Sequence, residues 1–66
     1  MTRCEEIDLE IRRQALRLYP CCVALFELPL MVYAQIKEDN TTRRNPYRVS
    51  EARIRKTIGT MPEFNK

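Results

Sequence analysis

The chain has 66 residues, with 12 basic and nine acidic side chains, three cysteines and no histidine. A domain of this size buries only about 60% of the surface of its unfolded chain, so disulfides, metal ions or oligomerisation usually support it. Three cysteines, two of them adjacent, and no histidine indicate neither a disulfide framework nor a four-ligand zinc site. We therefore expect oligomerisation, in the form of a homodimer, to complete the fold.

The first expected helix covers residues 2–19. It opens with a capping pattern, Thr2 followed three residues later by Glu5, and its acidic residues precede its basic ones, as the helix dipole favours. Pairs at helical spacing, Asp8 with Arg12 and Glu10 with Arg13, add to its stability. One apolar stripe follows the spacing of a buried helix face; it consists of Cys4, Ile7, Ile11, Ala15 and Leu18.

A second apolar ridge, Leu9 and Leu16, lies on another face of the same helix because the two residues are seven apart. It either widens the core face of a monomer or contacts a second copy or a partner protein. One further helix cannot easily cover both ridges, so the contact with another molecule is favoured.

Residues 20–39 hold the most apolar stretch, in which Glu27 is the one charge between Pro20 and Ile36. A chain this small cannot leave such a stretch in water, so it is buried in the monomer, between copies, against another protein or in a bilayer. The stretch is short for a membrane span, and Glu27 near its centre argues against one. Pro29 predicts a kinked helix, or a split whose second half starts near this proline. A strand hairpin is the alternative, but no turn signal divides the stretch.

Polar groups in this stretch have structural and functional interpretations. Glu27 could be a functional acid, but we expect it to reach the edge of the apolar region or to pair with Arg13 or Arg17. Cys21 or Cys22 could be a nucleophile at a helix start, but without a base partner both are expected in the core. With no histidine, one serine and one glycine, the composition favours neither catalysis nor a cofactor.

A polar connector, residues 40–48, leads to a short helix at residues 49–59 and a tail at 60–66. Ser50 is expected to cap the start of this helix and Pro62 to prevent its continuation. Gly59 is expected to end the helix by adopting a left-handed backbone conformation. Its expected buried edge is Ile54, Ile58 and Met61, opposite a face with Ala52, Arg53 and Lys56.

Charge is distributed unevenly, with a net −1 over residues 1–33 and +4 over residues 34–66. This basic half predicts contact with an acidic protein surface or with nucleic acid. The segment 52–66, ARIRKTIGTMPEFNK, resembles the recognition helix and following segment of winged-helix repressors of the Rex family, which implies DNA binding. The resemblance covers under a quarter of the chain, without the preceding positioning helix. The candidate basic residues are Arg43, Arg44, Arg48, Arg53, Arg55 and Lys56.

The sequence thus predicts an all-α domain, a helical hairpin or three-helix unit. Its acidic N-terminus differs from a secretion signal, and unpaired thiols indicate the cytoplasm. The favoured function is that of a small non-enzymatic protein that binds a larger protein and regulates or inhibits it. The alternative is a small DNA-binding regulator that uses residues 49–59. The candidate residues for a partner or dimer interface are Leu9, Leu16, Leu25, Phe26, Leu30 and Tyr33.

Overall fold

The computed structural model describes residues 2–21 and 23–64, and within them the chain forms three α-helices and no strand. The α-helices are α1 (Arg3–Leu18), α2 (Leu28–Asn40) and α3 (Glu51–Gly59), and two short 3₁₀ helices, η1 (Tyr19–Cys21) and η2 (Leu25–Glu27), lie between α1 and α2. The all-helical fold class is therefore confirmed, and the strand hairpin considered for the apolar stretch is wrong.

Helix α1 begins where the capping pattern predicts. Thr2 has an extended backbone, and its side-chain oxygen accepts a hydrogen bond from the backbone N–H of Glu5 at 3.2 Å. This bond satisfies one of the amides that the first turn of a helix leaves without a partner. The acidic Glu5 and Glu6 lie in the first turn and Arg17 in the last, which matches the direction of the helix dipole.

The apolar stretch is split and does not form one kinked helix. The short helices η1 and η2 occupy its first part, and α2 begins at Leu28. Pro20 lies in η1 and continues the end of α1, whereas Pro29 is the second residue of α2. A proline in the first turn of a helix removes an N–H that has no intrahelical acceptor, so it starts α2 at no cost in hydrogen bonding. Helix α2 then reaches Asn40.

Helix α3 is capped by Ser50, whose side-chain oxygen accepts from the Arg53 N–H at 3.2 Å. The expected left-handed exit at Gly59 is wrong, because no described glycine has a positive φ. Gly59 is instead the last helical residue, and Thr60 N–H and Met61 N–H each donate to a carbonyl three residues back, at 3.1 Å. The helix thus tightens into a final turn before Pro62.

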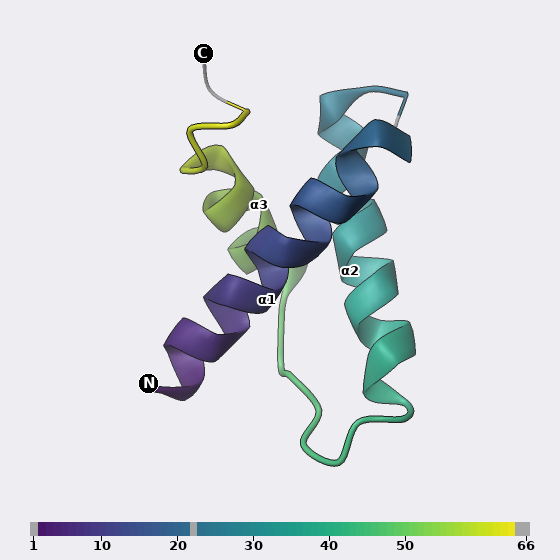
Figure 1. Cartoon of the computed structure of the whole chain (residues 1–66), viewed down its shortest axis with the longest axis vertical. Helices are drawn as coiled ribbons and strands as arrows, with labels where there is room; N and C mark the ends of the chain where they lie inside the picture. The colour runs from purple at the N-terminus through teal and green to yellow at the C-terminus, as the bar shows by residue number, and fades with distance from the viewer. Residues whose placement is uncertain (1, 22, 65–66) are drawn as a thin grey trace.

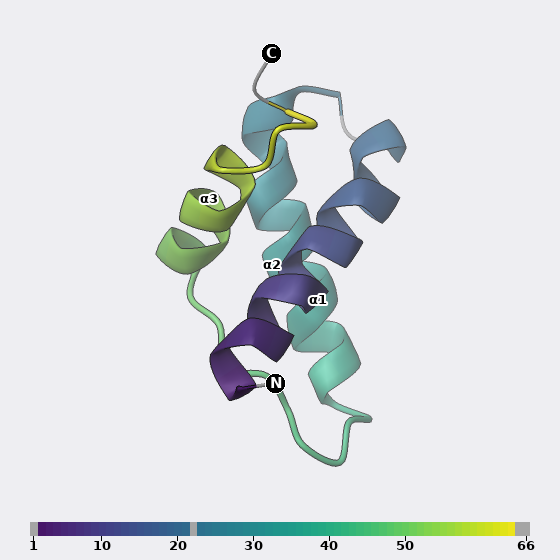
Figure 2. The same cartoon turned by 60° about the vertical axis from the view of Figure 1, so that its left-hand side comes forward.

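Helices α1 and α2 run antiparallel, and α3 packs against both, so that the chain forms a small three-helix unit (Figures 1 and 2). After α2 the connector loops below the end of α2 and returns upward to α3 (Figure 1). Among the described residues, no helix combines the length and the apolar character that crossing a membrane requires.

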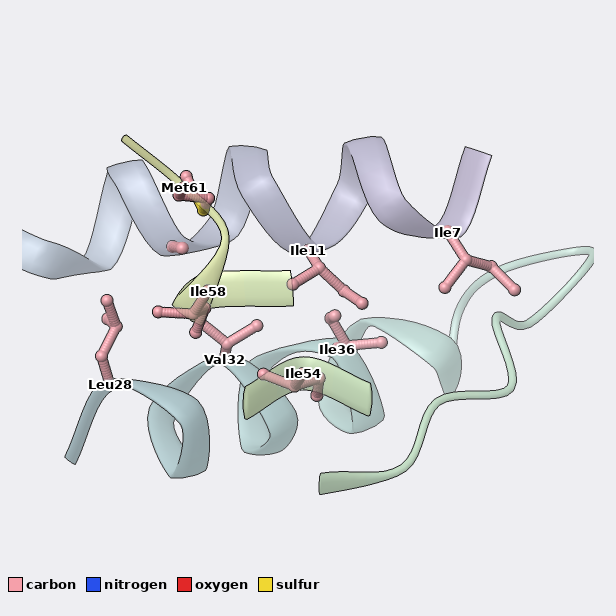
Figure 3. Packing of buried hydrophobic residues seen from close by; sticks show 9 residues of the cluster. Ile7, Ile11, Leu28, Val32, Ile36, Ile54, Ile58 and Met61 are labelled. Atoms are coloured by element: carbon pink, nitrogen blue, oxygen red, sulfur yellow. The ribbon is translucent and has the colours of Figure 1, made fainter. Parts of the chain in front are cut away.

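The core lies where the three helices meet (Figure 3). Ile11, Val32, Ile36 and Ile54 have no exposed surface, so each helix contributes at least one fully buried branched side chain. Such burial is the main favourable term in folding, at about 1.5–3 kcal/mol for each large side chain. Among the described residues, the buried apolar core consists of Ile7, Ile11, Ala15, Leu28, Val32, Ile36, Ile54, Ile58 and Met61.

Candidate interaction surfaces

A polar cluster joins the middle of α1 to the end of α2 and the connector. At its centre is Glu10, whose Oε2 accepts hydrogen bonds from Arg43 at 2.6 Å, Arg13 at 2.9 Å and Gln14 at 3.0 Å. Gln14 also donates to Asp39 of α2 at 3.2 Å. The Glu10 side chain is only 8% exposed, but three donors satisfy its charge. The cluster therefore fixes the connector to both helices through a carboxylate.

The charge of Glu10 is held by these donors against the effect of burial. Burial alone raises the pKa of a carboxyl, because desolvation disfavours the charged form. Here the hydrogen bonds from Gln14, Arg43 and Arg13 outweigh it, so the pKa of Glu10 lies below its ordinary value. Glu10 thus remains ionised, and its role in the described residues is to hold the fold together.

Two arginines and a tyrosine hold the connector in place. Arg3 and Arg43 both lie over the Tyr47 ring, with guanidinium carbons at 4.5 and 4.6 Å from its centre. Arg3 also donates to the carbonyls of Asn45 and Pro46, at 2.9 and 2.8 Å. The connector is therefore an ordered part of the domain, bound to the first turn of α1.

The predicted basic surface is divided by these contacts. Arg43 binds Glu10, Arg53 binds Asp8 of α1 at 3.1 Å, and Arg55 pairs with Glu51 within α3. The remaining three, Arg44, Arg48 and Lys56, are exposed. The six residues thus do not form one set of free cations, because half of them neutralise acids of the same chain.

Arg53 connects α3 to α1 more closely than the sequence indicates. Its Nη2 donates to the Asp8 carboxylate and to the carbonyl of Cys4, both at 3.1 Å. The hydrogen bond from Arg53 to Asp8 raises the pKa of the guanidinium. Asp8 was expected to pair with Arg12 on its own helix, but in the described residues its ion pair is with Arg53. A hollow of about 380 Å³ lies beside this pair, between α1 and α3.

The predicted apolar interface residues fall into two exposed groups and one packed residue. Leu25, Phe26 and Leu30, in η2 and the first turn of α2, are 42%, 77% and 50% exposed. Sequence reasoning missed Val23, which precedes them and is 94% exposed. The one feature of the sequence that could have indicated Val23 as an interface residue is its position in the apolar stretch. We call the exposed side chains Val23, Leu25, Phe26 and Leu30 the apolar turn.

The second group is the ridge of α1. Leu9 and Leu16 are 51% and 47% exposed, whereas Ile11 and Ala15 on the same helix are fully buried. Helices α2 and α3 therefore leave the ridge uncovered. Of the two alternatives for these leucines, the broad core face of a monomer does not apply. Tyr33 differs from both groups: it is half-buried against the core, with the Lys37 ammonium 5.7 Å from its ring centre.

The polar residues of the apolar stretch are placed differently from expectation. Glu27 is half-buried at the start of α2, and among the described residues its expected arginine partners bind elsewhere: Arg13 to Glu10 and Arg17 to Gln14. Cys21, expected in the core, is an exposed free thiol in the turn, and Cys4 is also exposed and free. Cys22 lies outside the described residues.

Within the described residues, no three cysteine, aspartate or glutamate side chains come close enough to hold a metal ion. Compared with protein family models, with curated proteins and with solved structures, the chain gives no match.

Proposed function

We propose that this protein is a non-enzymatic binding protein whose apolar turn docks onto a larger protein partner and thereby regulates or inhibits it. The observation that supports the proposal best is the exposure of Val23 and Phe26, at 94% and 77%. Single exposed apolar side chains are common, but four of them within eight residues of one turn are typical of an interaction surface.

The backbone of the turn supports this interpretation. The chain leaves η1, passes through the extended residue Ala24 and enters η2 before α2 begins. Folding of the three helices buries Leu28 completely, yet leaves Phe26 two residues earlier mostly in solvent. A large aromatic side chain near the end of a helical hairpin can fill a pocket on a partner, as the energetically dominant residues of protein interfaces do.

We assign a separate role to the α1 ridge, self-association through Leu9 and Leu16. These leucines lie along one face of α1, so two copies can align their ridges in an isologous dimer. The proposal places the protein in the cytoplasm, where the exposed thiols of Cys4 and Cys21 remain reduced.

Site-specific photo-crosslinking tests the partner role. A photoreactive phenylalanine analogue in place of Phe26, introduced in the cells that make the protein, is expected to capture one larger protein. The same analogue at Leu9, a 51% exposed apolar residue of the ridge, is the control and is expected to capture a second copy of the chain. The captured protein is then purified and its affinity for variants is measured.

The variants Phe26→Ser and Val23→Ser are expected to weaken that affinity at least tenfold, because each removes apolar surface that the partner covers. Leu9→Ser is expected to leave it unchanged. Equal affinity for wild type and Phe26→Ser, or capture of only the same chain at both positions, would reject the partner role.

Sedimentation tests the dimer independently. The wild type is expected to be dimeric at micromolar concentration, and the double variant Leu9→Glu, Leu16→Glu to be a folded monomer because both side chains already face solvent. A wild type that is monomeric throughout this range contradicts self-association but leaves the partner test intact.

DNA binding is the alternative function, and a separate measurement of affinity for duplex DNA tests it. Only three of the six candidate basic residues are free of internal ion pairs among the described residues, so the charge available to phosphates is small. We expect duplex DNA at physiological salt to bind no tighter than the non-specific range, with a Kd of about 10⁻⁴–10⁻⁶ M. A sequence-selective complex tighter than this range would replace partner binding as the function.

A further inference from the structure

The hollow between α1 and α3 has a composition unlike the apolar surfaces. It measures about 380 Å³ and is open to solvent on one side. Small-molecule sites of this size are usually lined mainly by apolar groups, whereas every side chain that lines this one is charged or bears a hydroxyl. Its lining residues are Asp8, Arg12, Arg53, Lys56, Thr57 and Thr60.

Three of these residues are cations that come from two helices. Arg12 is on α1, and Arg53 and Lys56 are on α3. Asp8 compensates the charge of Arg53 through their ion pair at 3.1 Å. Neither Arg12 nor Lys56 has an ion-pair partner within the described residues, so the hollow carries two positive charges that nothing in its lining balances.

The ion pair also orients Arg53 as a hydrogen-bond donor. Its bonds to Asp8 and to the Cys4 carbonyl both leave from Nη2. Nε and Nη1 donate to no described residue, so they remain available on a guanidinium that α1 already holds in position. A fixed guanidinium loses less entropy on binding a ligand than a mobile one.

Two threonine hydroxyls also line the hollow, and one of them extends the set of donors. Thr57 is on the buried side of α3 and is only 9% exposed. Thr60 caps the C-terminal end of the same helix. The Thr60 hydroxyl already donates its single proton to the Thr57 carbonyl at 2.8 Å, so it is not a donor for a ligand. The Thr57 hydroxyl forms no hydrogen bond with a described residue, so it is free to donate to a ligand.

From this geometry we infer that the α1–α3 hollow binds a phosphate group, either of a small phosphorylated ligand or of a lipid headgroup. Two uncompensated cations match the charge of a phosphate monoester, and guanidinium and hydroxyl donors match its several acceptor oxygens. None of the residues that line the hollow belongs to the apolar turn, so phosphate binding does not depend on the proposed partner. Binding there joins α1 to α3 by a bridge additional to the Arg53–Asp8 pair.

Nuclear magnetic resonance tests the inference with sodium pyrophosphate, added to the isotope-labelled chain at constant ionic strength set by sodium chloride. We expect saturable shifts of the amide signals of Arg12, Thr57 and Thr60. Arg12→Gln and Lys56→Gln are each expected to weaken binding about tenfold or more, since each removes a hydrogen bond between charged groups. Both side chains are exposed, so both variants are expected to fold.

The matched control is Arg44→Gln, which removes an exposed arginine in the connector, outside the hollow. It is expected to bind pyrophosphate as the wild type does. A second measurement, co-sedimentation with phosphatidylcholine vesicles with and without phosphatidic acid, distinguishes the source of the phosphate. Sedimentation that requires phosphatidic acid and Arg12 identifies a lipid headgroup, and pyrophosphate binding without sedimentation identifies a small soluble ligand.

Either result supports the site. Shifts that do not saturate, or affinities that Arg12→Gln and Arg44→Gln reduce equally, would show general attraction to a basic protein and overturn it. The partner test at Phe26 has a separate readout, so failure of one inference is distinguishable from failure of the other.

Discussion

The two ends of the α1–α2 hairpin differ in how they are closed. Where α1 begins and α2 stops, the connector is held to α1 at two places. Arg3 in the first turn of α1 binds connector carbonyls, and Glu10 in the middle of α1 binds Arg43 of the connector. At the other end η1 and η2 make a short turn whose large apolar side chains, Val23 and Phe26 above all, face solvent. The connector completes the first end. At the second end the Phe64 ring of the tail lies 4.9 Å from the Tyr19 ring of η1, but Val23 and Phe26 stay uncovered.

This difference shows that a domain with one short connector closes one end of its helical hairpin and leaves apolar side chains exposed at the other. The connector stays at one end of the hairpin and then returns to α3 (Figure 1). Polar contacts are adequate at the covered end because Glu10 meets three donors there. Apolar side chains at the uncovered end gain stability only when another molecule buries them. Substitutions that break the polar contacts of the first end are therefore expected to cost more stability than substitutions of the exposed side chains at the second end.

The largest effect is expected at the covered end, from Glu10→Ala. The substitution removes the carboxylate and leaves Arg43, which is only 23% exposed, without its shortest partner. Removing one member of a buried pair costs about 3 kcal/mol, the lower end of the usual range, because Asp39 at 3.6 Å still offers Arg43 a partner. Urea unfolding at neutral pH measures the loss.

Glu6→Ala is the matched control for this prediction. Glu6 pairs with Arg3 at 3.4 Å, but both side chains are more than 40% exposed. Solvent screening reduces such a pair to below about 1 kcal/mol. If the two variants lose the same stability, the cluster around Glu10 does not close this end of the hairpin.

Acid is expected to weaken the same cluster by a smaller amount. The pKa of Glu10 is lowered in the folded protein, so its contribution to stability is complete above the ordinary carboxyl pKa of 4.5. The contribution is lost as the pH falls through the lower, folded pKa, where Glu10 takes up a proton. The loss is smaller than in Glu10→Ala because a protonated carboxyl still fills its place and accepts hydrogen bonds.

Unfolding by urea over a series of pH values from neutral to acid measures this dependence. Glu10→Gln keeps the shape of the side chain without its titration, so its stability is expected to fall less steeply between pH 4.5 and the acid limit. Parallel pH profiles for the two proteins would assign the acid sensitivity to other carboxylates.

A still smaller effect is expected from Arg3→Ala. This change removes two hydrogen bonds to the connector, at 2.9 and 2.8 Å, and the contact with the Tyr47 ring. Because Arg3 is partly exposed, we expect a loss of about 1 kcal/mol, together with faster amide hydrogen exchange in the connector. Arg44→Ala, an exposed connector arginine, is the control and is expected to change neither quantity. Unchanged exchange in Arg3→Ala would mean that other contacts order the connector.

The sequence predicts the helices better than it predicts their contacts, for a physical reason. The caps at Thr2 and Ser50 and the helix start at Pro29 depend on groups within three residues of each other, so their signals are local. The Glu10–Arg43 pair joins residues 33 apart, and Arg53 and Asp8 are 45 apart. Charges with several available partners do not reveal such a choice until the helices are packed.

The candidate surfaces show the same limit. The exposed ridge of Leu9 and Leu16 follows from helical periodicity, since both lie away from the Ile11 and Ala15 stripe. In the apolar turn no period applies, because the chain changes from 3₁₀ to extended to helical backbone within a few residues. Val23 and Leu28 are therefore alike in the sequence, although one is almost fully exposed and the other fully buried.

The smallest effect on stability is expected at the uncovered end, from Val23→Ser. Val23 is 94% exposed, so its replacement removes almost no buried surface, and we expect a change within about 0.5 kcal/mol. The matched control is Val32→Ser, because Val32 is fully buried in α2 and a serine there loses packing and places a hydroxyl in the core. That control is expected to lose about 3 kcal/mol. Urea unfolding of both variants at a concentration where the protein is monomeric gives the comparison. A loss for Val23→Ser that approaches the loss for Val32→Ser would show that the turn packs within the monomer, and the uncovered end would then no longer support a docking surface.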